Sequence, residues 1–166
     1  MFKPTYYFEG IEKIDIKLLK KNKIKGLIMD VDNTIIDVMR NISDEKMKWI
    51  GDVKEAGIQI CILSNSSNLQ KVSQVANIIG VPYLLNGMKP AKKGYKMAIH
   101  ILDLKVDEVA MVGDQVFTDI WGANRMKMKS ILVEPFDIFE PFWVKAKRPI
   151  EKMILRKVSF TNKRGK

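Results

Sequence analysis

Apolar runs of four to six residues alternate with amphipathic stretches of ten or more along the middle of the chain. Apolar runs this short, bounded by glycine or polar residues, are typical of buried strands, and the longer stretches place apolar residues at helical spacing. Strands alternating with helices favour right-handed crossovers on a parallel sheet. The sequence therefore predicts an α/β fold, Rossmann-like, with a parallel five-stranded sheet and helices on both faces.

The ends of these elements carry the expected local signals. Ser43 is a predicted helix N-cap, followed by two acidic residues, and Gly57 and Gly80 are predicted to end two of the helices. Strands are expected at 26–30, 58–63, 82–85, 109–112 and 130–133, and helices between Ser43 and Gly57, at 67–79, at 91–102 and from about Thr118.

Length and composition indicate one globular domain over residues 1–166, with a core at about 24–135. Hydrophobic residues make up 46% of the 166, which is enough for a real core. Cys61 is the single cysteine, so no internal disulfide can form. No apolar run approaches the ~20 residues of a membrane span, and the first residues lack the apolar region of a secretory signal. The expected location is the cytoplasm.

Positive charge is concentrated at the C-terminal end. Residues 144–166 carry nine basic residues and one acidic residue, whereas residues 26–143 carry 13 basic and 15 acidic residues. A basic segment attracts polyanions, which makes an anionic membrane surface or a nucleic acid a candidate partner, the membrane being favoured. Aromatic residues before this segment and an apolar face after Pro149 suit an interfacial membrane contact, or else a last helix that docks on the sheet.

Polar side chains follow four of the expected strands at the point where each ends. Carboxyl ends of parallel strands meet at one edge of a sheet, where ligands bind, so these side chains are expected to converge. They are Asp30, Asp32 and Thr34 after the first strand, Ser64 and Asn65 after the second, Lys89 after the third, and Asp114 and Asp119 after the fourth.

This set of residues has the chemistry of a phosphoryl-binding site. Asp30 and Asp32 lie two apart, and with Asp114 and Asp119 they form an acidic cluster that needs a cation. Oxygen ligands without histidine or cysteine nearby favour Mg²⁺ over zinc. A lysine supplies fixed positive charge, and small donors can bind phosphoryl oxygens. The lysine is Lys89, with Lys92 and Lys93 as second choices, and the donors are Ser64 and the amides near Thr34 and Asn65.

Four segments resemble the four motifs of the haloacid dehalogenase (HAD) superfamily: Asp30–Thr34, Ser64–Asn65, Lys89–Pro90 and Gly113–Asp119. Further segments resemble the YqeG-type subclass III phosphatases, a family akin to the mitochondrial-type phosphatidylglycerophosphate phosphatases. They include Tyr6–Tyr7, Ile24–Gly26, Gly122–Arg125 and Ile131–Pro135. The similarity covers roughly residues 4 to 156.

The resemblance implies a role for each residue. Asp30 would be the nucleophile, and Asp32 would protonate the leaving oxygen and later activate water. Ser64 and Lys89 would hold the phosphoryl oxygens. The implied Mg²⁺ ligands are Asp30, the main-chain carbonyl of Asp32, Asp114 and, as ligand or support, Asp119, which would alternatively orient Lys89.

No insertion large enough for a cap domain is present. About eight residues separate Thr34 from Ser43, and three separate the third strand from Lys89. A capless HAD-like fold has an open site, which suits a large phosphorylated substrate. The expected function is a Mg²⁺-dependent phosphomonoester hydrolase that acts on a phosphatidylglycerophosphate-like lipid or another large phosphorylated substrate. The alternative is a non-catalytic adaptor that binds RNA or membrane through its basic segment. Intact catalytic positions weigh against that alternative.

Overall fold

The computed structural model of the 166-residue chain describes residues 1–135 together with Pro149 and Thr161. The basic segment 144–166 lies outside the described residues, apart from Pro149 and Thr161. So do the aromatic residues that precede it. The membrane and nucleic-acid contacts assigned to this region stay predictions.

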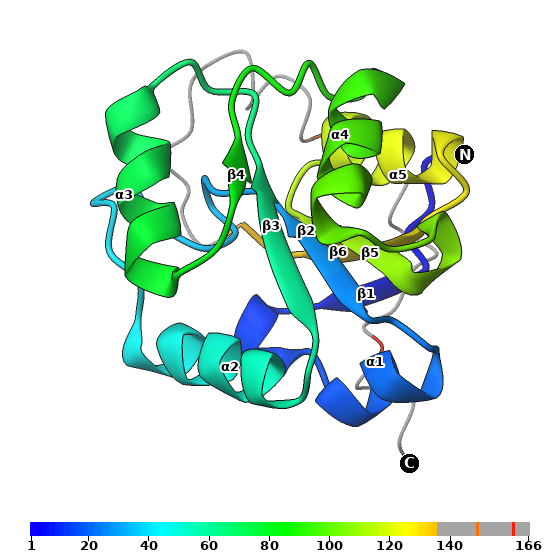
Figure 1. The fold of residues 1–166 in the computed structure, drawn as a ribbon, viewed down its shortest axis with the longest axis horizontal. Helices are drawn as coiled ribbons and strands as arrows, with labels where there is room; N and C mark the ends of the chain where they lie inside the picture. Colours follow the sequence, from blue (N-terminus) through cyan, green and yellow to red (C-terminus); the bar gives the residue numbers. More distant parts are fainter. Residues whose placement is uncertain (136–148, 150–160, 162–166) are drawn as a thin grey trace.

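The described strands form one parallel sheet (Figure 1). Its order is β1-β6-β5-β2-β3-β4. The strands are β1 (Tyr6–Phe8), β2 (Gly26–Met29), β3 (Gln59–Leu63), β4 (Tyr83–Leu84), β5 (Val109–Gly113) and β6 (Lys129–Val133). The parallel α/β fold is confirmed.

The predicted number of five strands is wrong, because β1 is a sixth strand. It pairs with β6 at the edge of the sheet, where Tyr6 lies opposite Ile131 and Phe8 opposite Val133. Three residues at an edge show no alternation that sequence could reveal, and this strand is held by its neighbour rather than by its own pattern.

Helices occupy most of the connections between strands. They are η1 (Ile11–Lys13), α1 (Ile16–Lys21), α2 (Asp44–Glu55), α3 (Leu69–Ile79), α4 (Lys92–Leu102), η2 (Val106–Glu108), η3 (Val116–Ile120) and α5 (Trp121–Arg125). Ser43 caps α2 by accepting a hydrogen bond from the Lys46 amide, and Gly80 ends α3 with a left-handed φ of 66°. No helix within the described part of the chain has the length and apolar character to cross a membrane.

Alternate residues of the central strands pack against opposite layers of helices. Leu27 and Met29 of β2 belong to a cluster with α1, α2 and α3, while Ile28 belongs to a second cluster with α4 and α5. Side chains that alternate across a strand account for this division, because each central strand is buried on both faces. Helices therefore cover both faces, as predicted.

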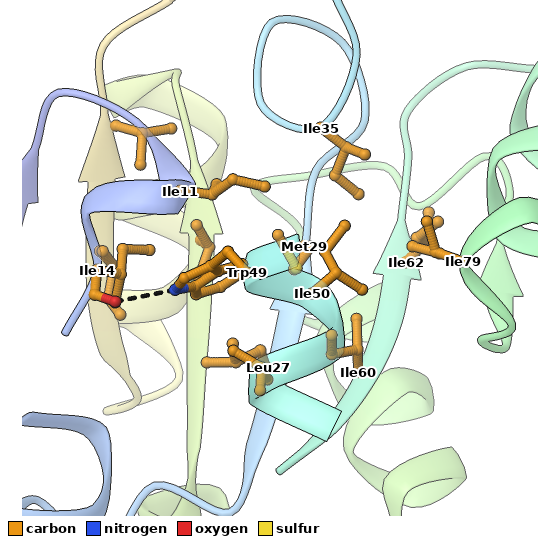
Figure 2. Packing of buried hydrophobic residues seen from close by; sticks show 14 of the residues in the cluster. Ile11, Ile14, Leu27, Met29, Ile35, Trp49, Ile50, Ile60, Ile62 and Ile79 are labelled. Atoms are coloured by element: carbon orange, nitrogen blue, oxygen red, sulfur yellow. Dashed lines mark hydrogen bonds between the residues drawn. The ribbon is translucent and has the colours of Figure 1, made fainter. Parts of the chain in front are cut away.

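Trp49 of α2 joins the N-terminal segment to the first of these clusters (Figure 2). Its ring is 6% exposed, and its indole Nε1 donates a 2.9 Å hydrogen bond to the carbonyl oxygen of Ile14. Ile11 packs in the same cluster. The connection from β1 to β2 is thereby fixed against α2 by both apolar contact and one buried hydrogen bond.

Replacing Trp49 by phenylalanine is expected to lower the free energy of unfolding by about 1–3 kcal/mol. The change leaves the buried Ile14 carbonyl without its hydrogen-bond donor and removes part of a packed ring. The measurement is urea unfolding. Trp121→Phe is the matched control, because the buried Trp121 Nε1 has no hydrogen-bond partner among the described residues. Equal losses in the two variants would contradict a role for the indole hydrogen bond.

Candidate active site

Asp30 and Asp114 are placed side by side by the sheet. Asp30 directly follows β2, Asp114 directly follows β5, and Met29 is the register partner of Val112 in these adjacent strands. The Asp30 amide continues the ladder with a 3.0 Å hydrogen bond to the carbonyl of Val112. From β2 the sheet extends to β3 and β4 on one side and to β5, β6 and β1 on the other. This reversal makes the end of β2 the expected ligand position of a parallel sheet.

Lys89 lies between two buried carboxylates. Its Nζ is 2.6 Å from Oδ1 of Asp30 and 2.7 Å from Oδ1 of Asp119, and the lysine side chain is only 2% exposed. Lys92 and Lys93, the second choices for this position, are exposed at the start of α4. The structure therefore brings Lys89 into the acidic cluster, and it leaves the other two lysines outside.

Burial and the neighbouring charges together raise the pKa of both Asp30 and Lys89. Burial raises the pKa of Asp30 to about 6; Lys89 opposes this rise, and Asp119 adds to it. Burial also works against the charged form of Lys89, but Asp119 and Asp30 outweigh it and raise the pKa of the lysine. The lysine therefore stays positively charged, and ionised Asp30 is disfavoured chiefly by its burial and secondly by the nearby charge of Asp119.

Asn65 holds the backbone of Lys89 in place. Its Oδ1 accepts a 2.7 Å hydrogen bond from the Lys89 amide, and its Nδ2 donates a 3.0 Å bond to the Lys89 carbonyl. The side chain of Asn65 is thus used to position the lysine, and phosphate binding by the main-chain amide near Asn65 stays a prediction.

Asp119 reaches the cluster because the chain after β5 makes a wide helical turn. This segment, η3, is a π-helical turn rather than the ordinary helix expected from about Thr118. The Gln115 amide donates a 3.1 Å hydrogen bond to Oδ2 of Asp119, whose other oxygen contacts Lys89. The carboxylate packs so closely over Gly113 that a Cβ there would collide with it. Glycine before Asp114 is therefore required by Asp119.

Three buried carboxylates meet where a cation would sit. Asp30, Asp114 and Asp119 each offer one oxygen, and these oxygens lie within 4.8 Å of one another. Oxygen donors with this much excess negative charge fit a hard divalent cation such as Mg²⁺. The expected place of the Asp32 carboxylate in the acidic cluster is wrong, because this carboxylate turns to Lys71 instead. A metal contact through the main-chain carbonyl of Asp32 stays a prediction.

Asp32 has a cation partner of its own that sequence reasoning missed. Nζ of Lys71 in α3 lies 2.8 and 2.7 Å from the two carboxylate oxygens of Asp32. The side chain of Asp32 is 49% exposed, far more than that of Asp30. The one signal for Lys71 was its place in the first turn of the helix that follows Ser64 and Asn65.

Ser64 and Thr34 are both buried at the strand ends, as predicted. Ser64 Oγ accepts a 3.1 Å bond from the Ser66 amide, which leaves its hydroxyl hydrogen to donate. Thr34 Oγ1 has no hydrogen-bond partner within residues 1–135, Pro149 and Thr161. Lys46, a second residue that sequence reasoning missed, is buried and donates to the Thr34 carbonyl at 2.9 Å. It fixes the loop that carries Asp32.

Asp30→Asn is expected to stabilise the protein in the absence of divalent metal. An acid whose pKa is raised from 3.8 to about 6 on folding opposes folding once it ionises. The free energy of unfolding should therefore rise by about 2–3 kcal/mol at pH 7.5, and the gain should vanish near pH 4. Urea unfolding with a chelator at the two pH values measures it.

The matched control for this effect is Asp52→Asn, the same change at a half-exposed residue of α2. It should give no gain at either pH. An Asp30→Asn protein less stable than the unaltered chain at pH 7.5 would contradict the destabilising charge at Asp30.

Comparison with known protein families agrees with this geometry. A family model described as mitochondrial PGP phosphatase matches residues 1–136. The chain belongs to this family. It is a phosphatase of the HAD superfamily, and the predicted membership is confirmed.

Two relatives cover nearly the whole chain. The probable phosphatase YqeG of Bacillus subtilis is 32% identical over 155 residues, which are 93% of this chain and 90% of that protein. The chloroplastic/mitochondrial phosphatidylglycerophosphate phosphatase 1 of Arabidopsis thaliana is 29% identical over 170 residues. That match covers 93% of this chain and 47% of the plant protein, so the chain spans about half of its length.

Solved structures share the fold. The cobalt-bound deoxy-D-mannose-octulosonate 8-phosphate phosphatase of Haemophilus influenzae superposes with a TM-score of 0.53 at 16% identity, covering 82% of this chain and 90% of that one. An uncharacterized protein from Listeria monocytogenes gives 0.57 at 21% identity, covering 81% and 100%. At these identities the likeness concerns the fold alone.

Proposed function

We propose that this phosphatase is a Mg²⁺-dependent phosphomonoester hydrolase that works through an aspartyl-phosphate intermediate and acts on a phosphatidylglycerophosphate-like lipid. The observation that carries the proposal is the buried contact of Lys89 with Asp30 and Asp119, next to Asp114. These contacts support a site at the end of β2 in which Asp30 is the nucleophile, Lys89 supplies a fixed positive charge, and the three carboxylates would hold a cation.

Each half of the reaction has a residue to perform it. Asp30 attacks phosphorus and forms an acyl phosphate, while the bond to the ester oxygen breaks and Asp32 gives that oxygen a proton. Asp32 then takes a proton from water, which attacks the phosphorus, releases inorganic phosphate and regenerates Asp30. Lys89, the Ser64 hydroxyl and the amide of Asn65 are the groups proposed to hold the phosphoryl oxygens.

Asp30, Asp114, the Asp32 carbonyl and Asp119 would hold Mg²⁺, with Asp119 as ligand or as support. The bound ion supplies charge stabilisation for the phosphoryl oxygens. Within the protein itself, Lys89 already neutralises part of the charge on Asp30 and Asp119. It thereby keeps the nucleophile ionised in spite of its burial.

Asp30→Asn is expected to reduce kcat for p-nitrophenyl phosphate by roughly 10³-fold or more, because an amide cannot form the acyl phosphate. Chelation of divalent metal should abolish turnover of the unaltered protein. Asp52→Asn is again the control and should keep full activity. A normal kcat in the Asp30 variant would rule out the covalent route.

A lipid substrate is supported by the surface around the site. Val38, Met39, Leu69 and Met88, here called the apolar rim, are 44–76% exposed. They lie in the connections that follow β2, β3 and β4, which is the edge of the sheet that carries Asp30. Isolated exposed apolar residues are ordinary, but four around one catalytic edge fit a partner that is itself apolar.

A cavity and three basic side chains extend this argument. A cavity of about 210 Å³ is lined by four apolar side chains, by Lys93, and by Asn86 and two glycines; the apolar residues are Leu84, Leu85, Met88 and Met97. Arg40, Lys92 and Lys93 are exposed on the same connections. Apolar side chains among basic ones suit an anionic lipid surface. By contrast, a cavity of about 500 Å³ at the amino ends of the strands is lined by none of the predicted site residues.

The double variant Met39→Asp/Met88→Asp is expected to lower co-sedimentation with anionic phospholipid vesicles at least threefold. It places negative charge where apolar contact with the lipid is proposed. Ile78→Asp is the matched control, because Ile78 is 62% exposed near the opposite end of α3. Activity on p-nitrophenyl phosphate should persist in both proteins. Equal pelleting of all three proteins would contradict membrane contact through the rim.

A further inference from the structure

Lys71 is a partly buried cation beside the active site that the reaction described above does not use. It lies in the first turn of α3, where its amide bonds to Oδ1 of the capping residue Asn68 at 2.9 Å. Its side chain is 14% exposed, and its ammonium group contacts both carboxylate oxygens of Asp32. The helix start and the ion pair together fix the position of this charge.

The position of Lys71 relative to the two aspartates defines which part of a substrate it meets. Lys89 accompanies Asp30, which bonds to phosphorus, and Lys71 accompanies Asp32, which serves the ester oxygen. The two lysines therefore stand on opposite sides of the bond that breaks: Lys89 on the phosphoryl side and Lys71 on the leaving-group side.

The ammonium group of Lys71 has hydrogen-bonding capacity left for a substrate. It carries three N–H donors, of which two are directed to the oxygens of Asp32. One donor remains, and a second becomes available when one Asp32 oxygen turns to the ester oxygen of the substrate. A cation that is 14% exposed gains more from an anionic partner than one in full contact with water.

We infer that Lys71 binds a second anionic group in the leaving part of the substrate, a phosphodiester close to the ester oxygen, and so selects substrates that carry one. The inference rests on the proposed function and names the feature of the lipid that the site recognises. When the leaving group lacks that anion, Lys71 stays paired only with Asp32. A leaving group that bears it gains a charge-assisted contact.

Two soluble substrates isolate this contact from the acyl chains. Glycerophosphoglycerophosphate, the deacylated form of phosphatidylglycerophosphate, carries the phosphodiester, and glycerol 3-phosphate does not. The unaltered protein should show at least about tenfold higher kcat/KM for the first. Lys71→Gln should reduce that preference, the ratio of the two kcat/KM values, about tenfold; loss of the Asp32 partner acts on both substrates alike and cancels in this ratio. Lys71→Arg should retain the preference.

Lys48→Gln is the control for loss of an ion-paired lysine, because Lys48 contacts Asp52 at 2.8 Å on the surface of α2. It should leave the preference unchanged, and thermal unfolding should show that all variants are folded. Equal losses on both substrates in Lys71→Gln, or no loss on either, would overturn the inference and leave the phosphatase activity standing. Failure of the unaltered protein to hydrolyse either substrate would overturn the proposed function, and this inference with it.

Discussion

The buried contact of Lys89 with Asp30 and Asp119 is the interaction around which the catalytic edge is built. A buried ion pair contributes little net stability, since desolvation offsets most of the attraction. Here two carboxylates contact one lysine, and an oxygen of Asp114 lies within 4.8 Å of theirs, so these four side chains together carry more acidic than basic groups. A protein has no structural reason to bury such an excess. In the proposed function, a divalent cation would neutralise the carboxylates and a phosphoryl group would contact the lysine.

Several features that otherwise look unrelated exist to hold this cluster. Asn65 fixes the backbone of Lys89 with two hydrogen bonds, and the π-helical turn of η3 carries Asp119 back over Gly113. Each device depends on the parallel sheet, because β2 and β5 must be neighbours for Asp30 and Asp119 to share one lysine. The fold thus supplies the proximity, and local backbone geometry supplies the orientation.

The sequence predicted those site residues that directly follow a strand, because the carboxyl ends of parallel strands meet at one edge of the sheet. Asp30 and Asp114 follow apolar strands directly, so the topology rule was sufficient to bring them together. Lys71 and Lys46 could not be found in this way. Each lies in a helix and contacts the loop after β2: Lys71 contacts Asp32, 39 residues away in the chain, and Lys46 contacts Thr34, 12 residues away. Such contacts depend on how the helices pack on the sheet. The spacing of apolar residues predicts which face of a helix packs, but it does not fix the helix position closely enough to predict a hydrogen bond. The edge strand β1 was missed for a related reason, since its partner β6 lies more than 120 residues away.

The unequal burial of Asp30 and Asp32, the two aspartates proposed to be catalytic, suggests a place for substrate selection. Asp30 and Lys89 are enclosed, so the phosphoryl side of the site admits a small group common to all phosphomonoesters. Asp32 is half exposed and contacts Lys71, and the exposed residues of the apolar rim lie in the connections at the same edge of the sheet, so the proposed leaving-group side combines apolar and positive character. Without an inserted domain after β2 or β4, nothing in the described part of the chain closes over that side. Under the proposed function, discrimination among substrates would then come from the surface next to Asp32, where Lys71 offers a contact for an anionic headgroup and the apolar rim offers one for an apolar tail.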